Sequence, residues 1–241
     1  TDGSNLLVKA LSNNGTFEFD RVKSFGFSEN GELLYYSKAE EDTLKNTGIF
    51  LVDLKTGQSK FIDEGKTEYI SAVFSPENKF LAFMATEDSA KSKKPYYDLF
   101  LYDIVKDKNQ KIASKGTLGI NGMVSKNGRL FFSHDENRLF FGTSPDYVAF
   151  RYEDDTTILE EERVSLDIWG WQDAEIQPMQ LRNKSREQEK SFLTLYNLKS
   201  KVFTQVGDKT VSQIVTDKKV KNQYGLGFDQ SPYRRNYSWD I

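Results

Sequence analysis

One motif occurs three times along the chain, and its copies align without a gap. Each copy opens with Phe-Ser, passes through a polar turn and ends in an apolar run rich in Leu, Phe and Tyr. The copies span Phe27–Tyr36, Phe74–Phe83 and Phe132–Phe141. Short strands that recur every 40–50 residues or so are typical of the blades of a β-propeller.

A second motif alternates with the first. It is a short apolar run followed by a polar turn, and its copies are Ile49–Gly57, Leu99–Ile104, Leu193–Ser200 and, more weakly, Leu7–Gly15. The runs have the length of strands, and Asn and Gly suit the tight turns between them. Return strands are predicted at Lys60–Ile62, Lys111–Ile112 and Val202–Val206. The longer interval before the third Phe-Ser copy predicts an insertion around Gly116–Gly119.

The two motifs together predict an all-β chain. We expect a β-propeller, a partial ring of about four to five blades, each a four-stranded antiparallel sheet. Residues 1–241 form one propeller domain in this interpretation. Leu7–Phe19 is the outer half of one blade, and Tyr224–Ile241 opens another. The alternative, a complete small propeller with divergent end blades, stays open at this point.

Composition excludes several kinds of chemistry. The chain has no cysteine and one histidine, His134, so disulfides, thiolate catalysis and multi-histidine metal sites are excluded. Lys and Arg number 33 against 36 Asp and Glu, which gives no electrostatic case for nucleic acid. No apolar run approaches the roughly 18 residues of a membrane span. We predict no catalytic residue, metal or cofactor here, and a surface position for His134.

Sequence motifs of hydrolases and nucleotide-binding proteins are absent. The chain contains no Gly-x-Ser-x-Gly elbow, phosphate-binding loop or His-Glu-x-x-His pair. Thr156–Gln180 departs from the repeat, and Val164–Trp169 alternates like a strand. Trp169, Trp171 and Asp173 are weak candidates for a substrate-binding cleft with aromatic walls, although core packing is the commoner role of Trp. Ser185–Lys190 is highly charged and is interpreted as a solvated loop.

Two stretches of sequence carry a family resemblance. The Phe-Ser turn resembles the repeat of WD40-like (TolB-type) propellers, and Gly31 and Pro76 each preserve part of its usual form. A closer resemblance is to the propeller of prolyl oligopeptidase (S9) family serine peptidases of Bacteroidetes-type bacteria. It is carried by Val164–Asp173 with Ile176–Leu181, Gly225–Arg235 and Leu139–Thr143.

The resemblance implies a function for the whole protein. In that family a propeller caps an α/β-hydrolase domain and admits peptides by size. It implies a periplasmic or secreted bacterial protein whose partners are the hydrolase domain of the same parent chain and peptide substrates. No residue here matches the family's catalytic motifs, so we expect this chain alone to be inactive. Arg151–Asp155 and Glu160–Glu162 match the glutamate pair of the dipeptidyl-peptidase relatives only loosely. The alternative is a stand-alone TolB-like propeller that binds a protein or glycan.

Overall fold

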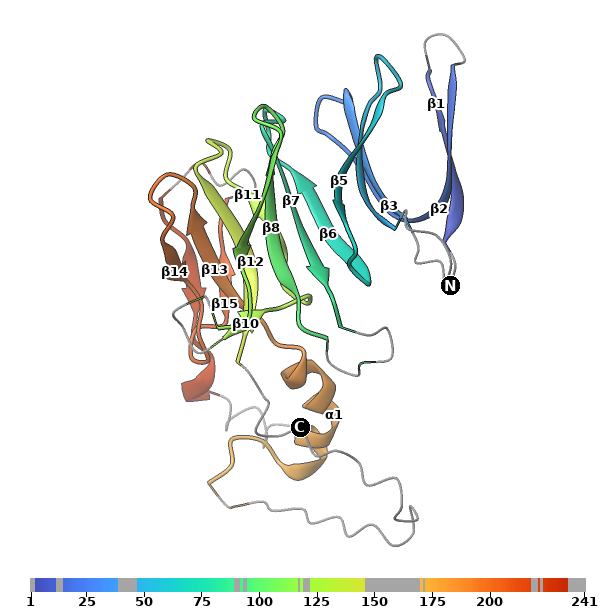
Figure 1. Ribbon diagram of the computed structural model, residues 1–241. Helices are drawn as coiled ribbons and strands as arrows, with labels where there is room; N and C mark the ends of the chain where they lie inside the picture. The colour runs from blue at the N-terminus through green and yellow to red at the C-terminus, as the bar shows by residue number, and fades with distance from the viewer. Residues whose placement is uncertain are drawn as a thin grey trace, which may run out of the picture.

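The protein is built from antiparallel sheets that stand beside one another in chain order (Figure 1). The computed structural model describes residues 3–11, 15–38, 47–88, 92, 95–116, 118, 122–145, 170, 172–217, 221 and 223–233. Neighbouring strands in each sheet are mostly neighbours in sequence, as expected where polar turns of a few residues join short apolar runs.

The first sheet contains five strands, each paired with the next. They are β1 (Ser4–Lys9), β2 (Thr16–Phe27), β3 (Leu33–Lys38), β4 (Gly48–Asp53) and β5 (Ser59–Glu64). The long strand β2 serves two blades, because its first half pairs with β1 and its second half pairs with β3. Between the halves, Arg21 has a φ of 57° and the register shifts. The second half of β2 with β3, β4 and β5 is a complete four-stranded blade.

Two further blades follow. The second contains β6 (Glu68–Phe74), β7 (Phe80–Thr86), β8 (Asp98–Asp103) and β9 (Lys108–Ala113). In the third, β10 (Met123–Val124) and β11 (Phe131–Phe132) both pair with β12 (Arg138–Ser144), which continues to β13 (Phe192–Asn197) and β14 (Phe203–Gln205). A hairpin of β15 (Gln213–Val215) and β16 (Leu226–Phe228) and a 3-10 turn (Ser231–Tyr233) end the described chain.

The three predicted Phe-Ser turns have the same geometry. In each turn the serine Oγ accepts a hydrogen bond of 3.0 Å from the backbone N–H five residues on, for Ser28, Ser75 and Ser133. The third residue after the serine has a positive φ, which is 71° at Gly31, 59° at Asn78 and 53° at Glu136. Gly and Asn adopt this conformation readily, which explains their place in the motif.

The blades pack face to face, and alternate residues of each strand serve opposite seams. Leu34, Tyr36 and Val52 of the first complete blade face the β1–β2 hairpin. Their neighbours Ile49 and Leu51 pack with Phe74 and Phe83 of the second blade. The other face of the second blade packs on the third through Ala82, Met84, Leu99, Leu139 and Phe141. Period-two burial on both faces means that each blade is covered by its neighbours.

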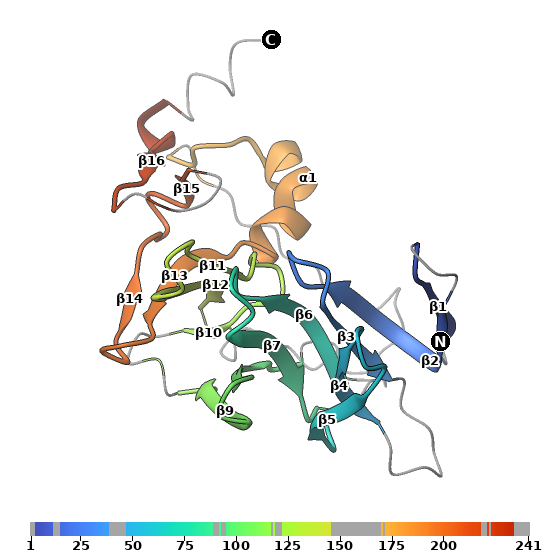
Figure 2. The same cartoon turned by 90° about the horizontal axis from the view of Figure 1, so that it is seen from above.

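These sheets form a partial β-propeller, so the predicted fold class is confirmed. Figure 2 shows the blades along an arc, with β2 and β6 on its inner side and β5, β9 and β14 on its outer side. The inner strands β2 and β6 contact each other across the seam between the first complete blade and the second blade. Within the described residues the chain makes three complete blades, an outer half blade (β1 with the start of β2) and an inner half blade (β15 with β16).

One local prediction was wrong. The charged segment interpreted as a loop belongs largely to a helix, α1 (Gln177–Gln188). Pro178 stands in its first turn, where proline is pre-organised for a helix, and the straight-chain Gln, Arg, Lys and Glu side chains that follow have good helix propensity. No residue of α1 is buried, so it lacks the apolar face from which a helix is usually predicted.

Candidate functional site

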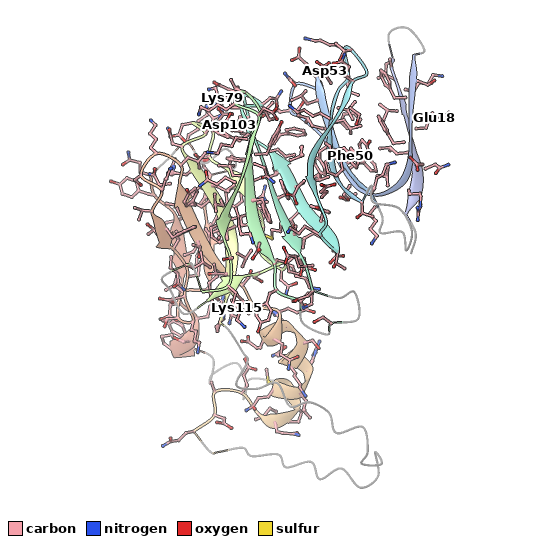
Figure 3. The ribbon with its side chains drawn as sticks, in the orientation of Figure 1. Glu18, Phe50, Asp53, Lys79, Asp103 and Lys115 are labelled. Atoms are coloured by element: carbon pink, nitrogen blue, oxygen red, sulfur yellow. The ribbon has the colours of Figure 1, made fainter. Side chains whose placement is uncertain are left out.

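The two ends of the blades differ in character. The Phe-Ser turns lie at one end, where Figure 3 shows Asp53, Lys79 and Asp103, whereas Lys115 lies at the other. Successive turns are tied together: Asn78 Nδ2 donates to Asn30 Oδ1 at 2.6 Å, and the Glu77 N–H donates to Glu136 Oε1 at 2.7 Å. We call this the turn end. Its contacts join blade to blade, which is a structural role.

The opposite end, which we call the loop end, carries helix α1 and a groove. Figure 1 shows α1 beyond the ends of the sheets, on the side away from the Phe-Ser turns. A groove of about 410 Å³ runs between α1 and the β15–β16 hairpin. The helix contributes Met179, Asn183 and Arg186, and the hairpin side contributes Lys209 and Phe228. The groove is therefore built by an insertion in the third blade and by the half blade that follows it.

The chemistry of this groove suits binding. Met179 and Phe228 provide apolar surface, and Arg186 and Lys209 provide positive charge. Lys190 also lines it and forms an ion pair of 3.3 Å with Glu187. Glu175 Oε2 accepts a hydrogen bond of 3.1 Å from Asn183 Nδ2. The walls of the groove are therefore mixed, with apolar, cationic and anionic side chains.

Of the three candidates from sequence, the structure describes one. Trp169 and Trp171 lie outside the described residues. Asp173 is exposed and ends the turn before α1, where its Oδ2 accepts hydrogen bonds from the Gly170 N–H at 2.9 Å and from Gln180 Nε2 at 3.3 Å. Asp173 does not line the groove, although Glu175 two residues later does. Its contacts support the start of the helix.

Sequence reasoning missed the residues that line the groove. Arg186, Lys209 and Phe228 belong to three separate segments, which no repeat motif joins. Pro178 followed by polar helix formers is the one signal that could have placed a helix here. The hairpin side of the groove could not be predicted from the sequence, because it depends on where β15 and β16 lie in space.

Two titratable groups with perturbed pKa values, Asp63 and Tyr69, lie at a blade seam away from the groove. Tyr69 Oη donates to Asp63 Oδ2, and Asn109 Nδ2 donates to Asp63 Oδ1, both at 3.0 Å. Burial raises the pKa of Asp63 above its ordinary value. Burial and the Asp63 carboxylate raise the pKa of Tyr69. Because Asp63 is on β5 and Asn109 on β9, this cluster fastens the first complete blade to the second.

His134 is exposed in the third Phe-Ser turn, where the sequence placed it. In the described part of the chain no three His, Asp or Glu residues come together in a way that could hold a metal ion. No described helix is long and apolar enough to cross a membrane.

Comparison with known proteins gives likeness in structure alone. No protein-family model matches the chain, and no curated protein matches it. TolB from Acinetobacter baumannii is 13% identical over 86% of this chain, with a TM-score of 0.43. The tricorn protease is 13% identical over 96% of the chain, with a TM-score of 0.41. An oligogalacturonate lyase in complex with manganese is 10% identical over 88%, with a TM-score of 0.46.

The TM-scores and identities of these three proteins are too low to support any inference about function. The chain spans 38% of the length of that TolB, 28% of the tricorn protease and 44% of the lyase.

Proposed function

We propose that this chain is a non-catalytic propeller cap of a bacterial S9-type serine peptidase. It would regulate the access of peptides to an α/β-hydrolase domain that lies outside the 241 residues. The parent protein would be periplasmic or secreted. The sequence resemblance of Val164–Asp173, Ile176–Leu181 and Gly225–Arg235 supports the family assignment, and the propeller architecture agrees with it.

The observation that carries the proposal is the groove at the loop end. A cap must present its binding surface where substrate passes, and in this groove apolar and charged side chains converge outside the seams. Met179 and Phe228 would contact side chains of the peptide. Arg186, Lys190 and Lys209 outnumber the two acidic residues that line the groove, Glu175 and Glu187, and would attract carboxylates of the peptide. This balance favours acidic peptides or a free C-terminus.

Covalent labelling tests the proposal that this chain is non-catalytic. A fluorophosphonate probe reacts with an activated serine, so it should leave this chain unlabelled and label the product of the whole parent gene. Labelling of the 241-residue chain would overturn the proposal. A parent gene without a downstream Gly-x-Ser-x-Gly segment would instead favour the stand-alone TolB-like propeller that binds a protein or glycan.

The role of the groove is tested by peptide binding to the chain. Exposed ion pairs contribute about 1 kcal/mol or less each, so the double variant Arg186→Ala/Lys209→Ala should bind an acidic fluorescent peptide about tenfold more weakly. Lys106→Ala is the matched control, since Lys106 is an exposed cation in a turn-end loop of the second blade, paired with Asp103. Equal affinities of the wild-type chain and the double variant would show that the peptide binds elsewhere.

A further inference from the structure

The two walls of the groove at the loop end are built differently. The hairpin wall continues directly from the third blade, where the N–H groups of Val206 and Gly207 both donate to the Leu193 carbonyl on β13, at 2.8 and 2.9 Å. Beyond this point β15 and β16 pair with each other. The hairpin wall is therefore joined to the third blade through backbone hydrogen bonds.

Two aspartate-stabilised turns present the polar groups of the hairpin wall. Asp208 Oδ1 accepts a hydrogen bond of 2.8 Å from the Thr210 N–H, and Lys209 lies between the two residues. Asp229 Oδ1 accepts a hydrogen bond of 2.9 Å from the Ser231 N–H in the same manner. Because both carboxylates are used within their own turns, the hairpin wall contributes the positive charge of Lys209 to the groove.

The helix wall packs much less tightly. No residue of α1 is buried, and a helix of about three turns is only marginally stable in water without packing. At its start, Gln180 Nε2 donates to the Glu175 carbonyl at 2.8 Å, and Asn183 Nδ2 donates to Glu175 Oε2 at 3.1 Å. These contacts hold α1 to the turn that precedes it in the chain. The helix and this turn together can therefore move relative to the sheets as one piece.

The helix wall presents one helix face to the groove. Met179, Asn183 and Arg186 line it at spacings of four and three residues, and Lys190 follows four residues after Arg186, just beyond the end of α1. Residues at these spacings lie on one face of a helix. The face therefore combines an apolar side chain, an amide and two cations.

Arg186 and Lys209 are cations on opposite walls. The two acidic residues of the helix wall each have a partner on that wall, since Glu187 pairs with Lys190 at 3.3 Å and Glu175 accepts from Asn183. Like charges repel one another over a Debye length of about 8 Å at physiological ionic strength, whereas a carboxylate between them attracts both. A carboxylate ligand therefore binds more tightly when the walls are close, which is the differential affinity that shifts a conformational equilibrium.

We propose that α1 is a lid that closes toward the β15–β16 hairpin when a carboxylate of a bound peptide bridges Arg186 and Lys209. In the closed state, Met179 and Phe228 enclose an apolar side chain of the same peptide. The ligand class is thus a peptide that carries a carboxylate beside an apolar residue. The inference rests on the peptide-binding groove of the proposed function and adds a moving part to it, because a closed lid slows release of the peptide.

Spin-label distance measurements test the closure, because the 241 residues contain no cysteine. Labels at Ser185→Cys on α1 and Val215→Cys on β15 report the distance between the walls, since both residues are exposed and neither lines the groove. An amidated peptide with Leu beside Glu should shorten and narrow the distance distribution. The same peptide with Gln in place of Glu should leave it unchanged. A neutral peptide with a free C-terminus distinguishes the terminal carboxylate from that of a side chain.

Charge reversal tests the cause of closure without any peptide. Arg186→Glu replaces the repulsion between the walls with attraction to Lys209, so it should shorten the distance between the labels in the unliganded chain. Raising the salt concentration should lengthen it again, because salt screens the attraction. Lys184→Glu is the matched control and should leave the distance unchanged, since Lys184 is exposed on α1 and lies outside the groove.

The outcomes separate the lid from the proposed function. If the chain binds the acidic peptide and the distance between the labels stays the same, the lid is overturned and the peptide-binding groove remains. If neither the acidic peptide nor the one with a free C-terminus binds, the groove and the lid are both overturned. An unchanged distance in Arg186→Glu would also overturn the lid, because the charge on the helix wall would then have no influence on the position of α1.

Discussion

Phe74 and Phe27 occupy the same place in the repeat and have different surroundings. Phe74, at the start of the second blade's turn, is 8% exposed, whereas Phe27, at the first, is 53% exposed. Their own turns are alike in backbone geometry and in the hydrogen bond to the serine Oγ. Among the described residues, the preceding blade is complete for Phe74 and half for Phe27, and this accounts for the difference in exposure. In this fold, the geometry of a turn depends on residues of its own blade, whereas the burial of its phenylalanine depends on the preceding blade.

The largest expected effect comes from truncating the two phenylalanines. Phe74→Ala removes a ring from a packed seam and should lower the free energy of unfolding by about 3–5 kcal/mol. Phe27→Ala should lower it by less than about 1 kcal/mol, because the ring is already half exposed to water. Urea unfolding of both variants measures the contrast. Similar losses in the two variants would mean that Phe27 is covered in solution.

The serines of the two turns should respond alike. Ser75→Ala and Ser28→Ala each remove the Oγ that accepts a backbone N–H, from Phe80 and Leu33 respectively. Both serines are buried, so each substitution should cost about 1–3 kcal/mol for the unsatisfied N–H. Chemical denaturation under the same conditions compares them. A much smaller cost at Ser28 would show that the end blade's turn is looser than its geometry indicates.

The smallest expected effect is the pH response of the third turn. Hydrogen bonds from Ser133 and Asn137 lower the pKa of Asp135 to about 2. Because the folded-state pKa is below the unfolded value of about 4, the stabilisation is present above pH 4 and is lost as pH falls toward 2. Asp135 is exposed, so solvent screening keeps the effect below about 1 kcal/mol.

Asp135→Asn should remove this part of the acid sensitivity, as seen in unfolding curves between pH 4 and pH 2. The first turn has a neutral residue, Asn30, two places after its serine, where the third has Asp135. The first turn is therefore the internal reference for acid sensitivity, because it has no carboxylate at this position. An unchanged acid profile in Asp135→Asn would assign the sensitivity to other carboxylates.

The repeats predicted the blades because a propeller strand is specified locally. Phe-Ser, a polar turn and an apolar run determine one hairpin. Because side chains of a strand alternate between its faces, Leu34 and Tyr36 serve one seam and Leu33 and Tyr35 the other. Helix α1 was not predicted, because none of its residues is buried and its sequence has no apolar period. The groove was not predicted because Arg186, Lys209 and Phe228 meet only through the packing of separate segments.

The serine hydrogen bond closes each hairpin between residues five apart in the chain, and this has a consequence for folding. Contacts of such short sequence separation close small loops, and in the first two complete blades each strand pairs with its neighbour in the chain. The blades should therefore behave as separate cooperative units joined by nearest-neighbour seams, as in a linear repeat array. Loss of one seam would then unfold the chain progressively from that point, while blades on the other side retained their native hydrogen-exchange protection.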